Sequence, residues 1–236
     1  MKKCMKRILI FFLVCMLIFL IPTGAITYQG YQRYVQVMEE KTLDEKIDEI
    51  QSKPNYTKLQ DLPQIYLDAV ISVEDKRFYQ HYGIDPISLV RAIRNNLRAK
   101  ALIEGDSTIT QQLAKNLYFD DEASLVRKAA EAMVTVVLEE RYSKDEILEL
   151  YVNCIYFGES YYCVYDASIG YFQKIPSQMT DFEATMLAGI PNAPSAYAPT
   201  VNMNLAVKRQ EKVLESMVRE GYLTEQEADI IQISGK

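Results

Sequence analysis

Apolar residues recur every three or four positions along most of this chain, which is the spacing of one face of an α-helix. The signal is strongest from about Leu62 onward, where residues typical of helix N-termini precede the apolar runs. Asp85-Pro86, for example, places an N-cap residue before a proline at the first helical position. Alternating strand patterns are scarce. The pattern therefore predicts one mainly α-helical domain over residues 62–236.

Capping residues locate several of the helix boundaries. A hydroxyl residue followed three positions later by a carboxylate can satisfy the free amides of a first helical turn. Gly221 follows an apolar run, at the position where a left-handed residue often ends a helix. The predicted helix starts are Thr108, Ser124, Ser143 with Glu146, Thr180 with Glu183, and Thr224 with Glu227. The predicted apolar stripes are Ile87, Val90, Ile93 and Leu97 in one helix and Ile109, Leu113 and Leu117 in the next.

The N-terminal segment has a different pattern. Residues 1–7 contain four cations, and residues 8–28 contain no charge over 21 positions, about the length that a helix needs to cross a bilayer. This asymmetry predicts a single-pass plasma-membrane anchor with a cytoplasmic N-terminus and an extracellular domain. A cleaved signal peptide is the alternative, since Thr23-Gly24-Ala25 fits a cleavage site; we favour the anchor because the uncharged run continues past it. Residues 29–61, charged and compatible with a helix, are expected to form a stalk.

Charge and cysteine content narrow the possible functions. Without the four N-terminal cations, 22 Lys and Arg stand against 32 Asp and Glu, a net charge of −10, so we expect no nucleic-acid partner. Cys154 and Cys163 would face an oxidising compartment, where they could form a disulfide or remain two small buried hydrophobes. No Cys-x-x-Cys or His-Glu-x-x-His spacing occurs, so no metal site is predicted.

The first candidate for chemistry is Glu74, which with Asp75 ends an apolar helical run ahead of the chain's single histidine, His81. A carboxylate where a packed helix gives way to a loop can be partly desolvated, which raises its pKa toward the range of a general base. An exposed acidic helix end balanced by Lys76 and Arg77 is the ordinary alternative. A structural role is the ordinary alternative for the histidine.

Two further clusters could bind a polar, anionic substrate. Helix spacing places Thr108, Gln111 and Lys115 on one face, a combination that suits sugar hydroxyls beside a phosphate; a solvated face with a capping hydroxyl is the alternative. Residues 127–131 bring Arg127, Lys128 and Glu131 together on another helix. This second cluster is either an ordinary surface ion pair or, in a cleft, two cations for a pyrophosphate and a second carboxylate opposite Glu74.

Together these segments resemble the signature of the peptidoglycan glycosyltransferases, family 51 of the glycosyltransferases. The resemblance covers about Leu62 to Tyr222 with the motifs in the family's order. No transpeptidase segment is visible, so the chain is similar to the monofunctional biosynthetic members. The motifs are Glu74-Asp75-x-Arg77-Phe78-x-x-His81-x-Gly83-x-Asp85, Ser107-Thr-Ile-Thr-Gln-Gln112-x-x-Lys115-Asn116, Arg127-Lys128-x-x-Glu131, Ile147-Leu148-Glu149-x-Tyr151-x-Asn153-x-x-Tyr156-Phe157-Gly158, and, at the end, Leu187-Ala188-Gly189 with Ala193-Pro194-Ser195-x-Tyr197.

The resemblance implies a lysozyme-like helical fold with a membrane-associated lobe, and polymerisation of lipid II into β-1,4-linked glycan strands with inversion and release of undecaprenyl pyrophosphate. Glu74 would be the base for the acceptor's 4-hydroxyl, and Glu131 the second carboxylate. A divalent cation (Mg or Mn) could assist. The implied partners are lipid II, the growing glycan strand, the membrane and other cell-wall synthesis proteins. The implied substrate-binding residues are Asp75, His81, Ser107, Thr108, Gln111, Gln112, Lys115, Arg127 and Lys128.

Departures from the family pattern keep a second function open. Asp106 replaces a usual glycine and could repel a pyrophosphate, and Ala123 stands where many members have an arginine. A weakly active relative that binds lipid II or synthase partners as a scaffold is therefore the alternative to an active enzyme. Retention of both carboxylates and three cations favours the enzyme. A glycan-cleaving hydrolase is a third possibility, although it has no use for a cationic cluster of this size.

The sequence also predicts that one lobe enters the bilayer. Arg91, Arg94 and Arg98 recur at helical spacing and precede Lys100 and the apolar residues 101–103. A cationic helix face attracts anionic headgroups, and a short apolar tip can be buried beneath them. The alternative is a solvated basic face with the apolar tip packed in the core.

Overall fold

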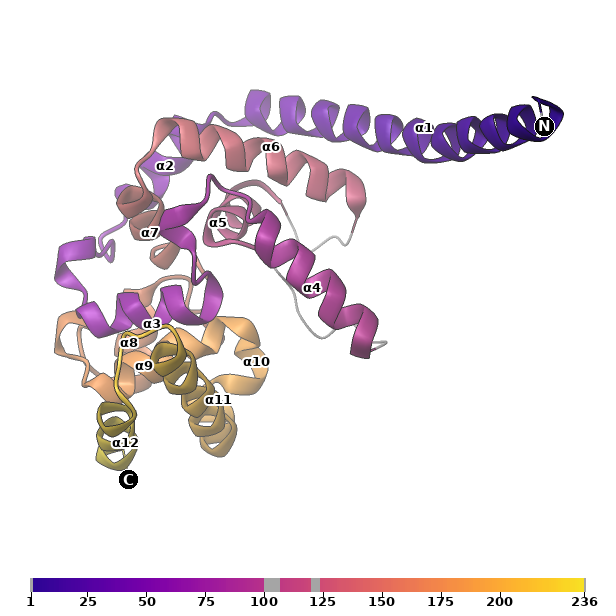
Figure 1. The fold of residues 1–236 in the computed structure, drawn as a ribbon. Coiled ribbons are helices and arrows are strands. Elements are labelled where there is room, and N and C mark those ends of the chain that lie inside the picture. The colour runs from indigo at the N-terminus through magenta and orange to yellow at the C-terminus, as the bar shows by residue number, and fades with distance from the viewer. Residues whose placement is uncertain (1, 100–106, 120–123, 236) are drawn as a thin grey trace.

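The computed structural model describes residues 2–99, 107–119 and 124–235 (Figure 1). Within these residues the regular elements are helices, with one isolated bridge between Tyr82 and Ile84, so the prediction of a mainly helical protein is confirmed. The helices are α1 (Lys2–Glu40), α2 (Leu43–Gln51), α3 (Gln64–Glu74), α4 (Pro86–Ala99), α5 (Ile109–Tyr118), α6 (Leu125–Arg141), α7 (Lys144–Val152), α8 (Val164–Phe172), α9 (Asp181–Gly189), α10 (Pro194–Tyr197), α11 (Pro199–Arg219) and α12 (Glu225–Ser234), and the 3₁₀ turns are η1 (Leu59–Asp61), η2 (Phe78–Gln80), η3 (Pro176–Gln178) and η4 (Ile190–Asn192).

The helices pack in two groups around a shared core. In one group α5 packs against α6 and α7, and α1 runs along α6 (Figure 1). In the other, α3 packs against α9 and α11, and α12 contacts α11. The end of α3, the residues just before α5 and one face of α11 all line a single cleft, so this cleft is built where the two groups meet.

The predicted helix starts are confirmed by their capping geometry. The Thr108 side chain accepts a hydrogen bond from the backbone N–H of Gln111, and the Gln111 side chain accepts one from the N–H of Thr108. Ser124 caps α6 in a similar way through the N–H of Arg127. Gly221 has φ +82°, the left-handed conformation expected after a helix. The capping boxes at Ser143, Thr180 and Thr224 are likewise formed with Glu146, Glu183 and Glu227.

Helix α1 extends well beyond the body of the protein (Figure 1). Its C-terminal part packs so closely on α6 that a methyl group at Gly30 would lie 2.6 Å from Ala129 Cβ. Among the helices of the described residues, none has the length and apolar character required to cross a membrane. The anchor predicted over residues 8–28 falls within α1 and stays a prediction.

The structure differs from the expected stalk over residues 29–61. Val37 on α1 and Leu43, Ile47 and Ile50 on α2 are buried in the core of the domain. The three residues of α2 recur four and three positions apart, and they form one apolar face in spite of the charges between them. A segment rich in charge can therefore still belong to the packed domain, because a narrow apolar face is enough to attach it.

Helix α4 begins at Pro86, as predicted, and Asp85 accepts hydrogen bonds from the backbone N–H groups of Ile87 (3.0 Å) and Ser88 (3.1 Å). Two residues of the predicted apolar stripe on this helix, Ile87 and Val90, are 63% and 67% exposed. Its membrane contact stays a prediction. The calls on residues 100–103, Asp106 and Ala123 lie outside the described residues.

Candidate active site

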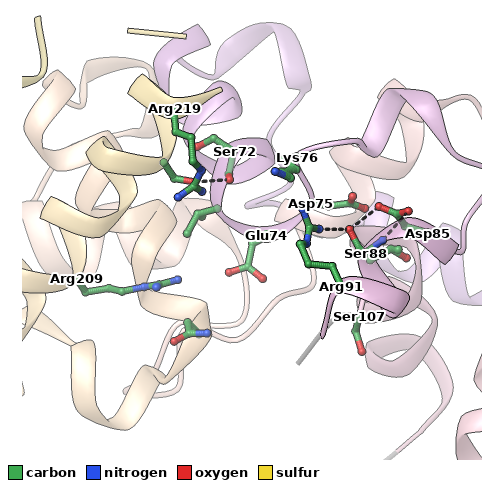
Figure 2. Close-up of a pocket in the computed structure, with 14 residues that line it drawn as sticks. Ser72, Glu74, Asp75, Lys76, Asp85, Ser88, Arg91, Ser107, Arg209 and Arg219 are labelled. Carbon is green, nitrogen blue, oxygen red and sulfur yellow. Dashed lines mark hydrogen bonds between the residues drawn. The ribbon is translucent and has the colours of Figure 1, made fainter. Parts of the chain in front are cut away.

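A polar cleft of about 530 Å³ lies beside the C-terminal end of α3 (Figure 2). Of the predicted site residues, Glu74, Asp75, Ser107 and Thr108 line it. The cleft walls also carry several cationic side chains, from the loop after α3, from α4 and from α11. Such a cavity can accommodate a substrate with both hydroxyl and anionic groups.

Glu74, the last residue of α3, has one engaged and one unengaged carboxylate oxygen. Its Oε2 accepts a hydrogen bond from Gln112 Nε2 at 2.8 Å. Its Oε1 is buried and has no hydrogen-bond partner within the described part of the chain. Burial raises the pKa of Glu74, while the bond from Gln112 and the charge of Arg209 oppose that shift. A carboxylate of raised basicity with one unengaged oxygen has the properties of a general base.

Asp75 connects the two segments that the sequence singled out. Its carboxylate lies 2.9 Å from His81 Nε2 and accepts a hydrogen bond from the backbone N–H of Ile109 at 3.1 Å. Both Asp75 and His81 have side chains less than 10% exposed. This geometry gives the pair a positioning role, because it fixes the loop after α3 to the first turn of α5.

Two polar residues at the start of α5, Thr108 and Gln111, have structural hydrogen bonds. Gln111 is buried, and its side chain is used in the capping box with Thr108. Thr108 is also buried, and its hydroxyl donates to the backbone oxygen of Gly83 at 2.5 Å. Gln112, one position further along, is the residue that reaches Glu74. Thr108 and Gln111 thus stabilise the helix start, as in the capping alternative, and Thr108 also lines the cleft. The role of Thr108, Gln111 and Lys115 in substrate binding stays a prediction.

The residues of the third cluster are brought together by the structure. Glu131 is 1% exposed and pairs with both Arg127 and Lys128. Lys128 Nζ also donates to Ser107 Oγ at 2.9 Å. Ser107 lines the cleft, whereas Glu131, Arg127 and Lys128 are not among its lining residues. The cationic cluster thus adjoins the Glu74 cleft through Ser107.

The sequence reasoning missed several residues of the cleft. Asn192, Arg209 and Arg219 all line it, although none was singled out. Arg209 lies beside a buried stripe of α11 that includes Gln210 and Val213. The sequence could therefore place Arg209 at the edge of a buried helix face. It could not show that this residue lies near Glu74.

The described cysteines and acids suggest neither a disulfide nor a protein-bound metal. Cys154 and Cys163 are free thiols. Burial raises the pKa of Cys154 to about 12 and that of Cys163 to about 11, so both are protonated at neutral pH. Among the described residues, no three His, Cys, Asp or Glu side chains form a group that could hold a metal ion. The suggested divalent cation therefore has no assigned protein ligands.

Comparison with known proteins agrees with the geometry. A family model described as Transglycosylase matches residues 39–218. Penicillin-binding protein 1A of Neisseria flavescens is 46% identical over 179 residues, which cover 76% of this chain and 22% of that protein. Penicillin-binding protein 1F of Bacillus subtilis (strain 168) is 40% identical over 194 residues, which cover 80% of this chain and 27% of that protein.

A crystal structure of penicillin-binding protein 1A from Haemophilus influenzae matches 75% of this chain and 17% of that chain, with a TM-score of 0.45 and 24% sequence identity. The family match shows that the chain belongs to the transglycosylase family. The chain spans about a quarter of the length of these curated relatives.

Proposed function

We propose that this protein is a peptidoglycan glycosyltransferase that polymerises lipid II into β-1,4-linked glycan strands. The observation that carries the proposal is Glu74, a buried carboxylate of raised pKa that Gln112 orients at a polar cleft. Membership of the transglycosylase family supports the same class of reaction.

In the proposed reaction Glu74 removes the proton from the 4-hydroxyl of the acceptor sugar. The resulting oxygen attacks the anomeric carbon of the growing strand, and the bond to undecaprenyl pyrophosphate breaks with inversion. A pyrophosphate leaving group needs cations more than it needs a protonating acid. Arg127 and Lys128, which Glu131 holds together, and Lys115 on α5 are proposed to supply them.

The remaining assigned residues prepare the site for this reaction. Ser107 contacts Lys128 and lines the cleft, so it is placed to meet substrate between the cations and the base. Asp75, His81 and Thr108 hold the loop and the start of α5 in place. The same proposal includes the lysozyme-like fold. Because lipid II is membrane-bound, it also includes the anchor over residues 8–28, a membrane-associated lobe and an extracellular site.

The test is incubation of the purified full chain with labelled lipid II, followed by electrophoretic separation of the products. Glycan chains of increasing length support the proposal. Binding of lipid II without polymer formation would instead identify a scaffold. Shortening of preformed glycan without polymer formation would identify a hydrolase. The Glu74→Gln variant is the control for any contaminating polymerase.

A further inference from the structure

Arg209 is held in a fixed position on the wall of the cleft. Its Nε donates to the backbone oxygen of Gly189 at 3.1 Å. Its guanidinium carbon lies 5.8 Å from the centroid of the Tyr197 ring, within the range of a cation–π contact. A methyl group at Gly189 would lie 3.0 Å from Arg209 Cγ, so the stem of the arginine lies directly on the bare glycine backbone. Contacts with the ends of both α9 and α10 therefore restrain this side chain.

The guanidinium of Arg209 points toward the carboxylate of Glu74 in Figure 2, and both residues line the cleft. Glu74 is in an unfavourable place for a negative charge. It is buried, and it ends α3, where the helix dipole is negative. A cation restrained on the opposite wall offsets part of this cost, which agrees with the lowering effect of Arg209 on the pKa of Glu74.

Other charged groups around Glu74 have partners of their own. The acids of α9 lie in its first turn, at the opposite end from Gly189. Gln112 on α5 and Tyr151 on α7 are neutral neighbours. The charged neighbours and their partners are Asp75 with His81, Lys76 and Arg219 with Glu220, Asp85 with Arg77, Arg91 with Ser88, and Lys128 with Glu131.

We propose that Arg209 is a positioning residue for the reaction, which keeps Glu74 ionised in its buried position so that the base is active at neutral pH. The inference rests on the proposed function, in which Glu74 is the base. The ionisation of Glu74 can nevertheless be measured without turnover, so the two proposals can fail separately.

The direct test is a carbon-13 NMR titration of the full chain, labelled at glutamate carboxyl carbons, in detergent. The signal of Glu74 is identified by its loss in Glu74→Gln. In Arg209→Gln its titration midpoint should move to higher pH, and in Arg209→Lys, which keeps the charge, it should move less. Gly189→Ala, which crowds the arginine stem, should also raise the midpoint.

Lys212→Gln is the matched control, because it removes one charge from the exposed side of the same helix, where Lys212 pairs with Glu215. The Glu74 midpoint should stay at the wild-type value in this variant. An unmoved midpoint in Arg209→Gln overturns the inference, as does an equal shift in Lys212→Gln.

The kinetic test separates this role from substrate binding. In Arg209→Gln the acid limb of the kcat profile should move to higher pH, with a several-fold loss of activity on that limb. At higher pH kcat should return to within about threefold of wild type, with KM little changed. A raised KM at every pH with an unmoved Glu74 midpoint would assign Arg209 to substrate binding and overturn the inference. If the wild type makes no polymer but the midpoint moves as expected, only the proposed function fails.

Discussion

Gln112 Nε2 donates a hydrogen bond to Glu74 Oε2 at 2.8 Å, across 38 positions of sequence. The same glutamine accepts a hydrogen bond from the hydroxyl of Tyr151, at 3.2 Å, through its other amide atom. The amide is therefore held in one orientation, with its donor toward the carboxylate. This arrangement leaves Glu74 Oε1 as the oxygen that could accept a proton from substrate.

The first prediction is that Glu74→Gln reduces polymerisation by about 10²–10⁴-fold, the usual contribution of a general base. The substitution keeps the size of the side chain and removes its basicity. The measurement is the initial rate of glycan formation from labelled lipid II, with circular dichroism to show that the fold is retained. Polymer formation at the wild-type rate would contradict the assignment of Glu74.

The same substitution should also stabilise the protein in a pH-dependent manner. Burial raises the folded-state pKa of Glu74 above its ordinary value of 4.5, so the ionised carboxylate costs stability at any pH above the folded pKa. The cost is about 1.4 kcal/mol for each unit by which the pKa is raised, and it disappears as the pH falls through the folded pKa toward 4.5. Melting temperatures should therefore favour Glu74→Gln at pH 8, with a smaller advantage at pH 5. An advantage that grows toward low pH would contradict the raised pKa.

Lys128→Ala should weaken lipid II binding by about tenfold or more, since a hydrogen bond to a charged group contributes about 1.5–3 kcal/mol. Its melting temperature should change little, because the Lys128 side chain is 39% exposed and Arg127 still pairs with Glu131. Binding is measured with fluorescent lipid II, and Lys212→Ala, at an exposed ion pair on α11, is the control. A marked loss of stability with unchanged binding would return Lys128 to a structural role.

The packing of the loop that precedes α4 can be tested by comparing alanine substitutions at Gly83, in this loop, and at Gly221, after α11. Both have positive φ (+76° and +82°), so alanine is strained at either position. A methyl group at Gly83 would lie 2.7 Å from Thr135 Cγ2, whereas nothing lies within 4 Å of one at Gly221. Chemical denaturation should show a loss of about 1 kcal/mol for Gly221→Ala and at least 1–3 kcal/mol more for Gly83→Ala. Equal losses of stability would show that the loop can move to avoid the clash with Thr135, which would contradict this prediction.

Asn153 attaches the segment before α3 to α7. Its side chain accepts from the backbone N–H of Thr57 and donates to the Thr57 oxygen, both at 2.8 Å, in a buried position. Asn153→Ala should cost about 2–3 kcal/mol, because two buried backbone groups lose their partners. The control is Asn202→Ala, because the exposed Asn202 side chain accepts a single local hydrogen bond from the backbone N–H of Leu205, and the loss of this bond should cost about 1 kcal/mol. Similar losses of stability in the two variants would contradict the structural role of Asn153.

Local features of this protein could be predicted from the sequence because they depend on neighbouring residues. The capping box of Thr108 and Gln111 and the ion pairs of Glu131 with Arg127 and Lys128 involve positions three or four apart on one helix. The near-complete burial of Glu131 could not be predicted in this way. Burial depends on which other helices cover that face.

For helix α2, the expectation from the sequence differed from the structure. Its apolar residues Leu43, Ile47 and Ile50 were present in the sequence, but the charges between them suggested a stalk. Only the packed structure shows that this face is part of the core.

The sequence by itself determined the helical class, the helix starts and the identity of Glu74 as a candidate base, because periodicity and capping are local properties of the chain. The tertiary structure decided which residues act on that base. Gln112 donates a hydrogen bond to Glu74, and Arg209 lines the same cleft from a different helix; no local spacing relates these residues. Their proximity depends on the packing of α3 against α11 and on the bond between Asp75 and Ile109, which places the start of α5 at the end of α3.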